Sequence, residues 1–115
     1  MPNVLLVNNN LRNRKTLRSY FNRLNWPSQE VATKEEAVDA LNSGMFDILI
    51  AALCMKPEGG RSIARTVQYI APEVKVYLVT SWKGDFDFGV LKQDGIQDVF
   101  KVGIEFNDFK ARVLS

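Results

Sequence analysis

The sequence predicts an α/β fold, in which an open parallel β-sheet of five strands is covered by helices on both faces. Short, unbroken apolar runs at Val4–Val7, Ile48–Ala52 and Val74–Val79 are typical of strands buried on both faces. Amphipathic segments with apolar residues at helical spacing lie between these runs. A chain of 115 residues also has the length of one domain with a hydrophobic core.

The first strand, Val4–Val7, is followed by three asparagines and a predicted helix over residues 11–24. Leu17, Phe21 and Leu24 are spaced so that they form one apolar stripe on that helix. Five basic residues fall off the stripe and no acidic residue accompanies them: Arg12, Arg14, Lys15, Arg18 and Arg23. The net charge of +2 is therefore unevenly distributed, with its excess at the N-terminal end.

The second strand, Ser28–Ala32, has little apolar content, and Pro27 before it suits an edge strand. Thr33 and Glu36 have the spacing of a capping box, which predicts that a helix begins there. That helix is expected to end before Gly44 and to bury three residues: Ala37, Val38 and Leu41.

The remaining elements continue the alternation. After the third strand, Ile48–Ala52, an apolar stripe of Ile63, Val67 and Ile70 predicts a helix closed by Pro72. The fourth strand, Val74–Val79, and a short fifth strand at Val99–Phe100 follow. The last helix is expected to bury Phe106, Phe109 and Val113, with Asn107 or a neighbour as its cap.

The composition excludes several classes of site. The single cysteine, Cys54, cannot form a disulfide within the chain, and without histidine the commonest general base and zinc ligand are missing. We expect neither a metal nor a cofactor. The sequence shows neither a signal peptide nor a membrane-spanning run, so we expect a soluble, cytoplasmic protein.

In open parallel sheets, ligands bind outside the carboxyl ends of the strands. Four segments lie at or just past those ends: 8–10, 52–55, 80–81 and 102–103. We expect any site of this chain to be built from them.

Four stretches resemble the receiver domain of bacterial two-component response regulators: "NVLLVNNN", "FDILIAALCMKPEGG", "VKVYLVTS" and "GIQDVFKVG". The resemblance covers essentially the whole chain. It implies a CheY-like, flavodoxin-like (βα)5 fold with strand order 2-1-3-4-5, and a single receiver-like domain over residues 1–115. Because the last helix is short, we expect this domain to be the N-terminal part of a longer regulator.

The resemblance also shows what the chain lacks. The acidic pair of working receivers falls on Asn8 and Asn9, the phosphoacceptor aspartate on Ala52, the switch hydroxyl on Thr80 and the lysine on Val102. The aromatic residue that moves with the hydroxyl falls on Val99. Magnesium needs anionic oxygens, and phosphoryl transfer to the protein needs a nucleophilic carboxylate. We therefore expect a degenerate pocket that is not phosphorylated.

The asparagines have a structural interpretation as well: Asn8 or Asn9 would cap the following helix or hydrogen-bond across the pocket. Thr80 at a strand end is most often a local hydrogen-bonding residue. Lys101 precedes the expected lysine position by one residue, so its side chain should face the other side of the strand unless a bulge intervenes.

Two surfaces are candidates for protein contacts. One is the basic face of helix 11–24, and the other holds the aromatic residues Trp82, Phe86 and Phe88. Either surface has an ordinary alternative, a solvated charged face for the first and core packing of a phenylalanine for the second.

We therefore expect a non-enzymatic pseudo-receiver that acts in regulation through a protein partner: an effector domain, a kinase or a second copy of the chain. It should have no small-molecule substrate and no membrane contact, and should reach nucleic acid only through an effector domain. Three alternatives stay open. Cys54 and Arg61 on a glycine-rich loop resemble a phosphatase loop that is one residue too long. A non-standard phosphorelay role and nucleic-acid binding by helix 11–24 are the others.

Overall fold

The computed structural model describes residues 2–54, 59–82 and 88–114, without the side chain of Phe88. Its strands form one parallel sheet in the order β2-β1-β3-β4-β5, which confirms the predicted fold class and strand order. The five strands have these bounds: β1 (Val4–Val7), β2 (Ser28–Val31), β3 (Ile48–Ala52), β4 (Lys75–Thr80) and β5 (Ile96–Lys101).

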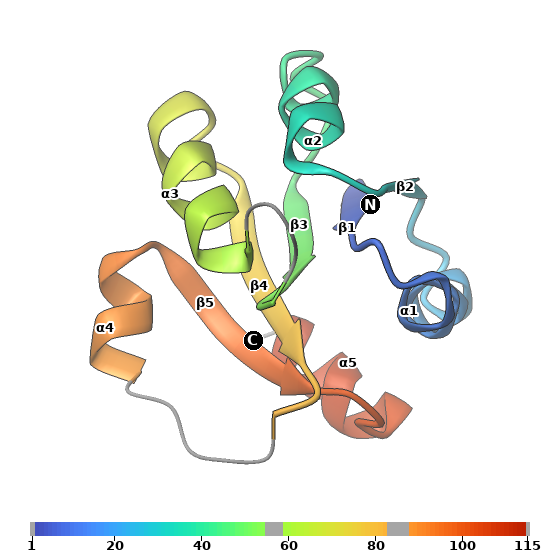
Figure 1. The fold of residues 1–115 in the computed structure, drawn as a ribbon. Helices are drawn as coiled ribbons and strands as arrows, with labels where there is room; N and C mark the ends of the chain where they lie inside the picture. Colours follow the sequence, from blue (N-terminus) through green and yellow to red (C-terminus); the bar gives the residue numbers. More distant parts are fainter. Residues whose placement is uncertain (1, 55–58, 83–87, 115) are drawn as a thin grey trace.

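Helices cover both faces of the sheet: α1 (Leu11–Arg23), α2 (Lys34–Leu41), α3 (Gly60–Ile70), α4 (Phe88–Gln93) and α5 (Phe106–Leu114). α1 and α5 lie together on one side, and α2 and α3 on the other (Figure 1). The ring of Tyr20 in α1 packs at centroid distances of 5.4 and 5.3 Å against Phe106 and Phe109 of α5. None of the described helices has the length and apolar character that a bilayer crossing requires.

The core follows from the position of each strand. Every residue of β1 and β3 is buried, because these strands lie inside the sheet and are covered on both faces. In β2, at the edge, Val31 alone is fully buried, which confirms the edge position expected from its polar sequence. The capping box of α2 is formed as well: the Glu36 amide donates to Thr33 Oγ1 at 3.1 Å.

Several predicted core positions are wrong in detail. Ile70 is 40% exposed because it is the last residue of α3, whose buried face instead includes Ala64 beside Ile63 and Val67. Val38, Leu24 and Phe106 are only partly buried. Asn107 is not a cap: α5 begins at Phe106, and its first turn closes when the Phe109 amide donates to the Glu105 carbonyl at 3.0 Å.

The boundaries of the last two strands also shift. β4 runs one residue later than predicted, and β5 is longer than the predicted Val99–Phe100. Val76 pairs with Ile96 and Tyr77 with Asp98, so one extra residue of β5 bulges at position 97. The polar residues Gln97 and Asp98 interrupt the apolar run at this bulge, so the sequence predicts only the second half of β5.

α3 begins in direct contact with the end of β3. A Cβ atom at Gly60 would lie 2.6 Å from both the Ala52 carbonyl oxygen and Leu78 Cδ2, so only glycine allows this close approach. The Gly60 amide donates to the Leu53 carbonyl at 3.1 Å. The backbone around Ala52 is thereby fixed next to the carboxyl edge of the sheet.

Candidate functional site

A cavity of about 180 Å³ opens at the carboxyl ends of β1, β3, β4 and β5. Ten residues line it: Asn8, Asn9, Asn10, Asn13, Ala52, Cys54, Val79, Thr80, Ser81 and Val102. Five of the six residues onto which the receiver pattern falls therefore lie around one cavity, and Val99 is the exception. No aspartate or glutamate lines this cavity within residues 2–54, 59–82 and 88–114.

Asn8 is one of two buried polar residues that line this cavity in the described part of the chain, with only 3% of its surface exposed; the other is Thr80. Its Oδ1 atom accepts a hydrogen bond of 2.8 Å from the Asn10 amide, which shapes the turn between β1 and α1. Its Nδ2 group finds no acceptor among the described residues. The oxygen of Asn8 thus holds the turn, while its Nδ2 group has no hydrogen-bond partner among the described residues.

Asn10 caps α1. Its Oδ1 atom accepts a hydrogen bond of 3.1 Å from the Asn13 amide, and its backbone has the extended conformation of an N-cap. The expectation that Asn8 or Asn9 would cap this helix is therefore wrong, because α1 begins at Leu11 and the cap belongs to the residue directly before it. Asn9 is exposed and lies at the mouth of the cavity.

The residues of β3 and β4 that face the cavity carry little chemistry. Ala52 offers a methyl group and is 9% exposed. Thr80 is buried, and its Oγ1 atom accepts a hydrogen bond of 3.0 Å from the Trp82 amide. That contact is the local hydrogen bond expected of a threonine at a strand end.

Lys101 does not replace the lysine missing at Val102. Its Nζ atom donates to the Trp82 carbonyl at 3.0 Å and lies 5.9 Å from the centre of the Trp82 ring. The bulge of β5 lies before Asp98, and pairing from Asp98 to Lys101 is continuous. Val102 therefore faces the cavity, its amide bonded to the Thr80 carbonyl at 2.8 Å.

Val99 is buried where the resemblance expects an aromatic residue. The neighbouring aromatic residue, Phe100, stacks on Tyr77 with ring centres 5.4 Å apart and packs against Phe109 at 5.1 Å. Burial, and then the charge of Asp98, raise the pKa of Tyr77 above 10.0. These aromatic rings belong to the core and not to the cavity.

Asp98 on β5 ties the strand to α5. Arg112 donates from Nε to Asp98 Oδ2 at 2.7 Å and from Nη2 to the Val99 carbonyl at 2.9 Å. Its hydrogen bonds to Asp98 raise the pKa of Arg112.

The basic residues of α1 do not form one solvated surface. Arg18 donates to Glu30 on β2 at 2.7 Å, and Arg14 lies 3.8 Å from the same carboxylate. The guanidinium of Arg23 lies 3.8 Å from the centre of the Phe106 ring. Arg12 and Lys15 are exposed, and neither forms a salt bridge within the described part of the chain.

The second predicted contact surface is described only in part. Trp82 is 53% exposed, and its carbonyl accepts a hydrogen bond from Lys101. Val102, the residue after Lys101, is 45% exposed. Phe86 lies outside the described residues, and Phe88 is described only as the first residue of α4.

The phosphatase alternative finds no support in the described loop ends. Cys54 is exposed at the cavity, but Arg61 donates from Nε to Asp94 Oδ2 at 2.8 Å. Arg65 lies 3.5 Å from the same carboxylate. Arg61 therefore joins α3 to the end of α4 and is not directed at a phosphate loop around Cys54.

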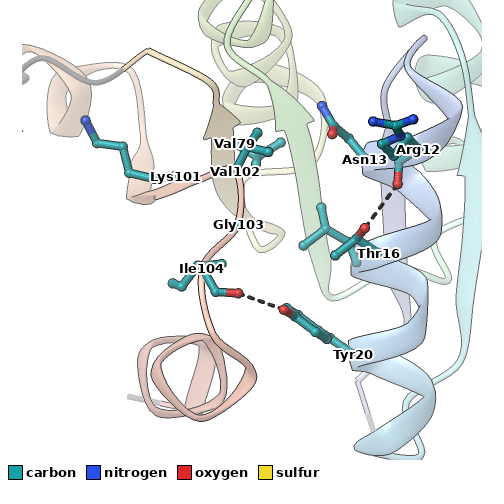
Figure 2. A pocket seen from close by; sticks show the side chains of 10 residues that line it. Arg12, Asn13, Thr16, Tyr20, Val79, Lys101, Val102, Gly103 and Ile104 are labelled. Atoms are coloured by element: carbon teal, nitrogen blue, oxygen red, sulfur yellow. Dashed lines mark hydrogen bonds between the residues drawn. The ribbon is translucent and has the colours of Figure 1, made fainter.

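A second cavity, of about 150 Å³, was not predicted from the sequence. It lies between α1 and the segment after β5, and Figure 2 shows the hydrogen bond of 2.7 Å from the Tyr20 hydroxyl to the Ile104 carbonyl across it. Three residues line both cavities: Asn13, Val79 and Val102. An apolar cavity thus adjoins the polar one. The hydrogen bond across it joins two residues that lie 84 positions apart in the chain.

The residues present do not fit a magnesium ion. The described lining residues offer uncharged oxygens, apolar groups and the Cys54 thiol, whereas magnesium prefers anionic oxygen ligands. Across the described residues, no three acidic, cysteine or histidine side chains gather in a way that would hold a metal ion.

Comparison with known proteins agrees with this architecture. The family model of the response regulator receiver domain matches residues 4–114. No curated protein sequence matches the chain significantly.

Among solved structures, the chemotaxis protein CheY4 of Vibrio cholerae superposes with a TM-score of 0.88 at 15% identity, over 99% of this chain and 97% of that one. A CheY-like receiver domain protein of Methanospirillum hungatei gives 0.87 at 11% identity, over 99% and 91%. A response regulator of Burkholderia pseudomallei with a phosphorylated aspartic acid and a calcium ion gives 0.84 at 16% identity, over 97% and 66%.

Proposed function

The chain belongs to the response regulator receiver domain family, and we propose that it is a receiver that accepts no phosphoryl group and acts through a protein partner. The family assigns it to two-component signalling. One observation carries the rest of the proposal: among the described residues, the cavity at the carboxyl ends of the strands is lined by amides, hydroxyls, apolar groups and the Cys54 thiol, and by no carboxylate.

Phosphorylation of a receiver needs an attacking carboxylate and a metal ion that neutralises the phosphoryl oxygens. At the phosphoacceptor position Ala52 supplies a methyl group, which cannot form an acyl phosphate. Asn8 and Asn9 supply uncharged amides, and Asn8 already uses its oxygen to accept from the Asn10 amide. Both requirements are therefore unmet at the positions that the family pattern assigns to them.

The two residues at the family's switch positions also do not support switching. Thr80 is buried and accepts a hydrogen bond from the Trp82 amide, and Val99 has no aromatic ring that could change its orientation. A change of state must then come from a molecule that binds two conformations with different affinity. A protein partner fits two exposed apolar residues: Val102, which lines the cavity, and Trp82, which follows the lining residues Thr80 and Ser81 in the chain.

The test is incubation of the purified protein with acetyl phosphate and magnesium chloride, followed by intact-mass measurement. We expect an unchanged mass. A gain of one phosphoryl group would overturn the proposal.

Two controls make an unchanged mass informative. A receiver with an intact acidic pocket, treated in the same way, must gain the phosphoryl group. The variant that combines Asn8→Asp, Asn9→Asp, Ala52→Asp and Val102→Lys restores the family pattern on this backbone. We expect it to accept phosphate, because the cavity already brings these four positions together.

A further inference from the structure

The apolar cavity between α1 and the segment after β5 reaches the surface of the molecule. Leu17, Tyr20 and Ile104 supply its walls, and Thr16 and Val102, which also line it, are exposed. The hydrogen bond of 2.7 Å from the Tyr20 hydroxyl to the Ile104 carbonyl holds the two walls together. An apolar cavity of about 150 Å³ has room for one small apolar group.

The charged residues at this cavity are basic. Arg12 lines it, is exposed, and forms no salt bridge in the described part of the chain. The other charged lining residue, Lys101, points away from α1 and donates to the Trp82 carbonyl (Figure 2). Glu105 follows the cavity segment in the chain but is not among the lining residues. Arg12 is therefore the cation on the α1 side of the cavity.

The first half of α1 carries positive charge that the described residues do not neutralise. The positive end of the helix dipole lies at the N-terminus, where acidic side chains are stabilising, yet the first turn of α1 has none. Glu30 pairs with Arg14 and Arg18 on the β2 side of the helix. Lys15 is exposed, forms no salt bridge among the described residues, and lies one turn from Arg12. Carboxylates of another molecule would complement both cations.

We propose that this surface binds an acidic segment of a partner protein that presents one aliphatic side chain. The aliphatic side chain enters the cavity between Leu17 and Ile104, and carboxylates beside it contact Arg12 and Lys15. Lys15 does not line the cavity, so a small molecule seated there would reach only Arg12, whereas a polypeptide segment reaches both cations. The inference rests on the proposed function, because it names the chemistry of the partner.

The probe is the synthetic peptide acetyl-EEELEEE-amide, titrated into the ¹⁵N-labelled protein at constant ionic strength while amide spectra are recorded. We expect saturable shifts of the backbone amides of Leu17, Val102 and Ile104. The same peptide with alanine in place of leucine leaves the cavity unfilled and should bind about tenfold more weakly. The peptide with lysines in place of the glutamates should not bind saturably, because like charges repel.

Three variants of the protein locate the site. Arg12→Glu and Lys15→Glu should each weaken binding of the acidic peptide at least about threefold. Their matched control is Lys75→Glu, which makes the same change of charge at an exposed position at the start of β4, on the opposite edge of the sheet, and should leave the affinity unchanged. Thr16→Trp fills the cavity from an exposed lining position, so it should abolish the preference for leucine over alanine.

Four outcomes overturn the inference. The first two are the absence of saturable binding and equal affinity for the leucine and alanine peptides. The third is an affinity that falls in Arg12→Glu but not in Lys15→Glu, or that falls equally in Lys75→Glu, with native amide spectra. The fourth is tighter binding of a ten-nucleotide oligothymidylate than of the acidic peptide, which would assign the cations to nucleic acid.

The peptide titration and the phosphorylation assay fail independently of one another. A protein that gains a phosphoryl group but still binds the leucine peptide would overturn the proposed function alone. A protein of unchanged mass that does not bind the peptide would overturn the inference about the partner alone.

Discussion

The aromatic cluster and the cavity at the carboxyl edge are two regions of one scaffold built from opposite kinds of side chain. We use aromatic cluster for Tyr20, Phe21, Phe100 and Phe109, whose rings pack at centroid distances of 5.1 to 5.3 Å around a fully buried Phe109. The cavity is small, polar on one side and open to solvent at Asn9. The cluster joins α1, β5 and α5, whereas the cavity joins the loops that follow the strands.

The difference explains how the receiver fold is stable with Asn8, Asn9 and Ala52 at the positions onto which the acidic residues of the family pattern fall. Apolar burial in the sheet and in the aromatic cluster stabilises the fold whether or not the cavity carries carboxylates. Adjacent carboxylates repel one another when both are ionised, so an Asn pair removes a cost that a metal ion would otherwise offset. The region that stabilises the fold is therefore separate from the cavity at the carboxyl edge.

The strongest way to break the comparison is to truncate the aromatic cluster. Phe109→Ala should lower the free energy of unfolding by about 3 to 5 kcal/mol, because it leaves a cavity among Tyr20, Phe21 and Phe100. Urea titration followed by circular dichroism measures the loss. Tyr69→Ala, at a residue 89% exposed, should change stability by less than about 0.5 kcal/mol. Equal effects of the two substitutions would contradict the role of the cluster.

The contact of Gly60 with β3 tests where the scaffold meets the cavity. Gly60→Ala should cost about 1 to 3 kcal/mol, since the new Cβ atom would overlap a backbone oxygen as well as Leu78. The same urea titration measures it. Gln68→Ala, at an exposed position of the same helix, is the control and should be nearly neutral. A Gly60→Ala variant as stable as the control would show that the loop relaxes freely.

Asn9 and Asn10, the two residues before α1, extend the comparison to smaller changes in the free energy of unfolding. Asn10→Ala should lower the free energy of unfolding by about 1 kcal/mol, because it removes the cap of α1. Asn9→Ala should stay within about 0.5 kcal/mol, since Asn9 is exposed. Thermal or urea unfolding of both variants measures the difference. A larger loss of stability in Asn9→Ala than in Asn10→Ala would contradict the assignment of Asn10 as the cap.

The smallest expected effect lies in the pH dependence of stability. The raised pKa of Tyr77 means that the folded protein holds the phenol proton more tightly than the unfolded chain does. Its contribution is complete below pH 10.0 and is lost as the pH rises through the folded-state pKa. Tyr77→Phe should therefore lose less stability than the wild type above that pH. Urea midpoints that fall by the same amount in both proteins as the pH rises would refute this.

Local sequence signals predicted most of the fold. The apolar runs gave three strands nearly to the residue, because a strand buried on both faces must be apolar throughout. The capping box of α2 was predicted from Thr33 and Glu36 alone, since its hydrogen bonds join neighbours in the chain. The first half of β5 was missed, because the polar residues Gln97 and Asp98 interrupt the apolar pattern there.

The candidate site was predictable in composition but not in geometry. The family pattern gave five cavity residues, yet it did not show which asparagine caps α1 or that the amide nitrogen of Asn8 is buried without an acceptor. It also did not indicate that Glu30 forms salt bridges with Arg14 and Arg18. These salt bridges partly neutralise the basic surface of α1.

The sequence by itself determined the alternation of strands and helices and the chemical character of the cavity, because burial periodicity and side-chain type are properties of each segment. Tertiary structure alone decided the second cavity beside Tyr20, the direction of Lys101 toward Trp82, and the pairing of Arg61 with Asp94. These features depend on side chains that are distant in the chain and meet only when the helices pack on the sheet.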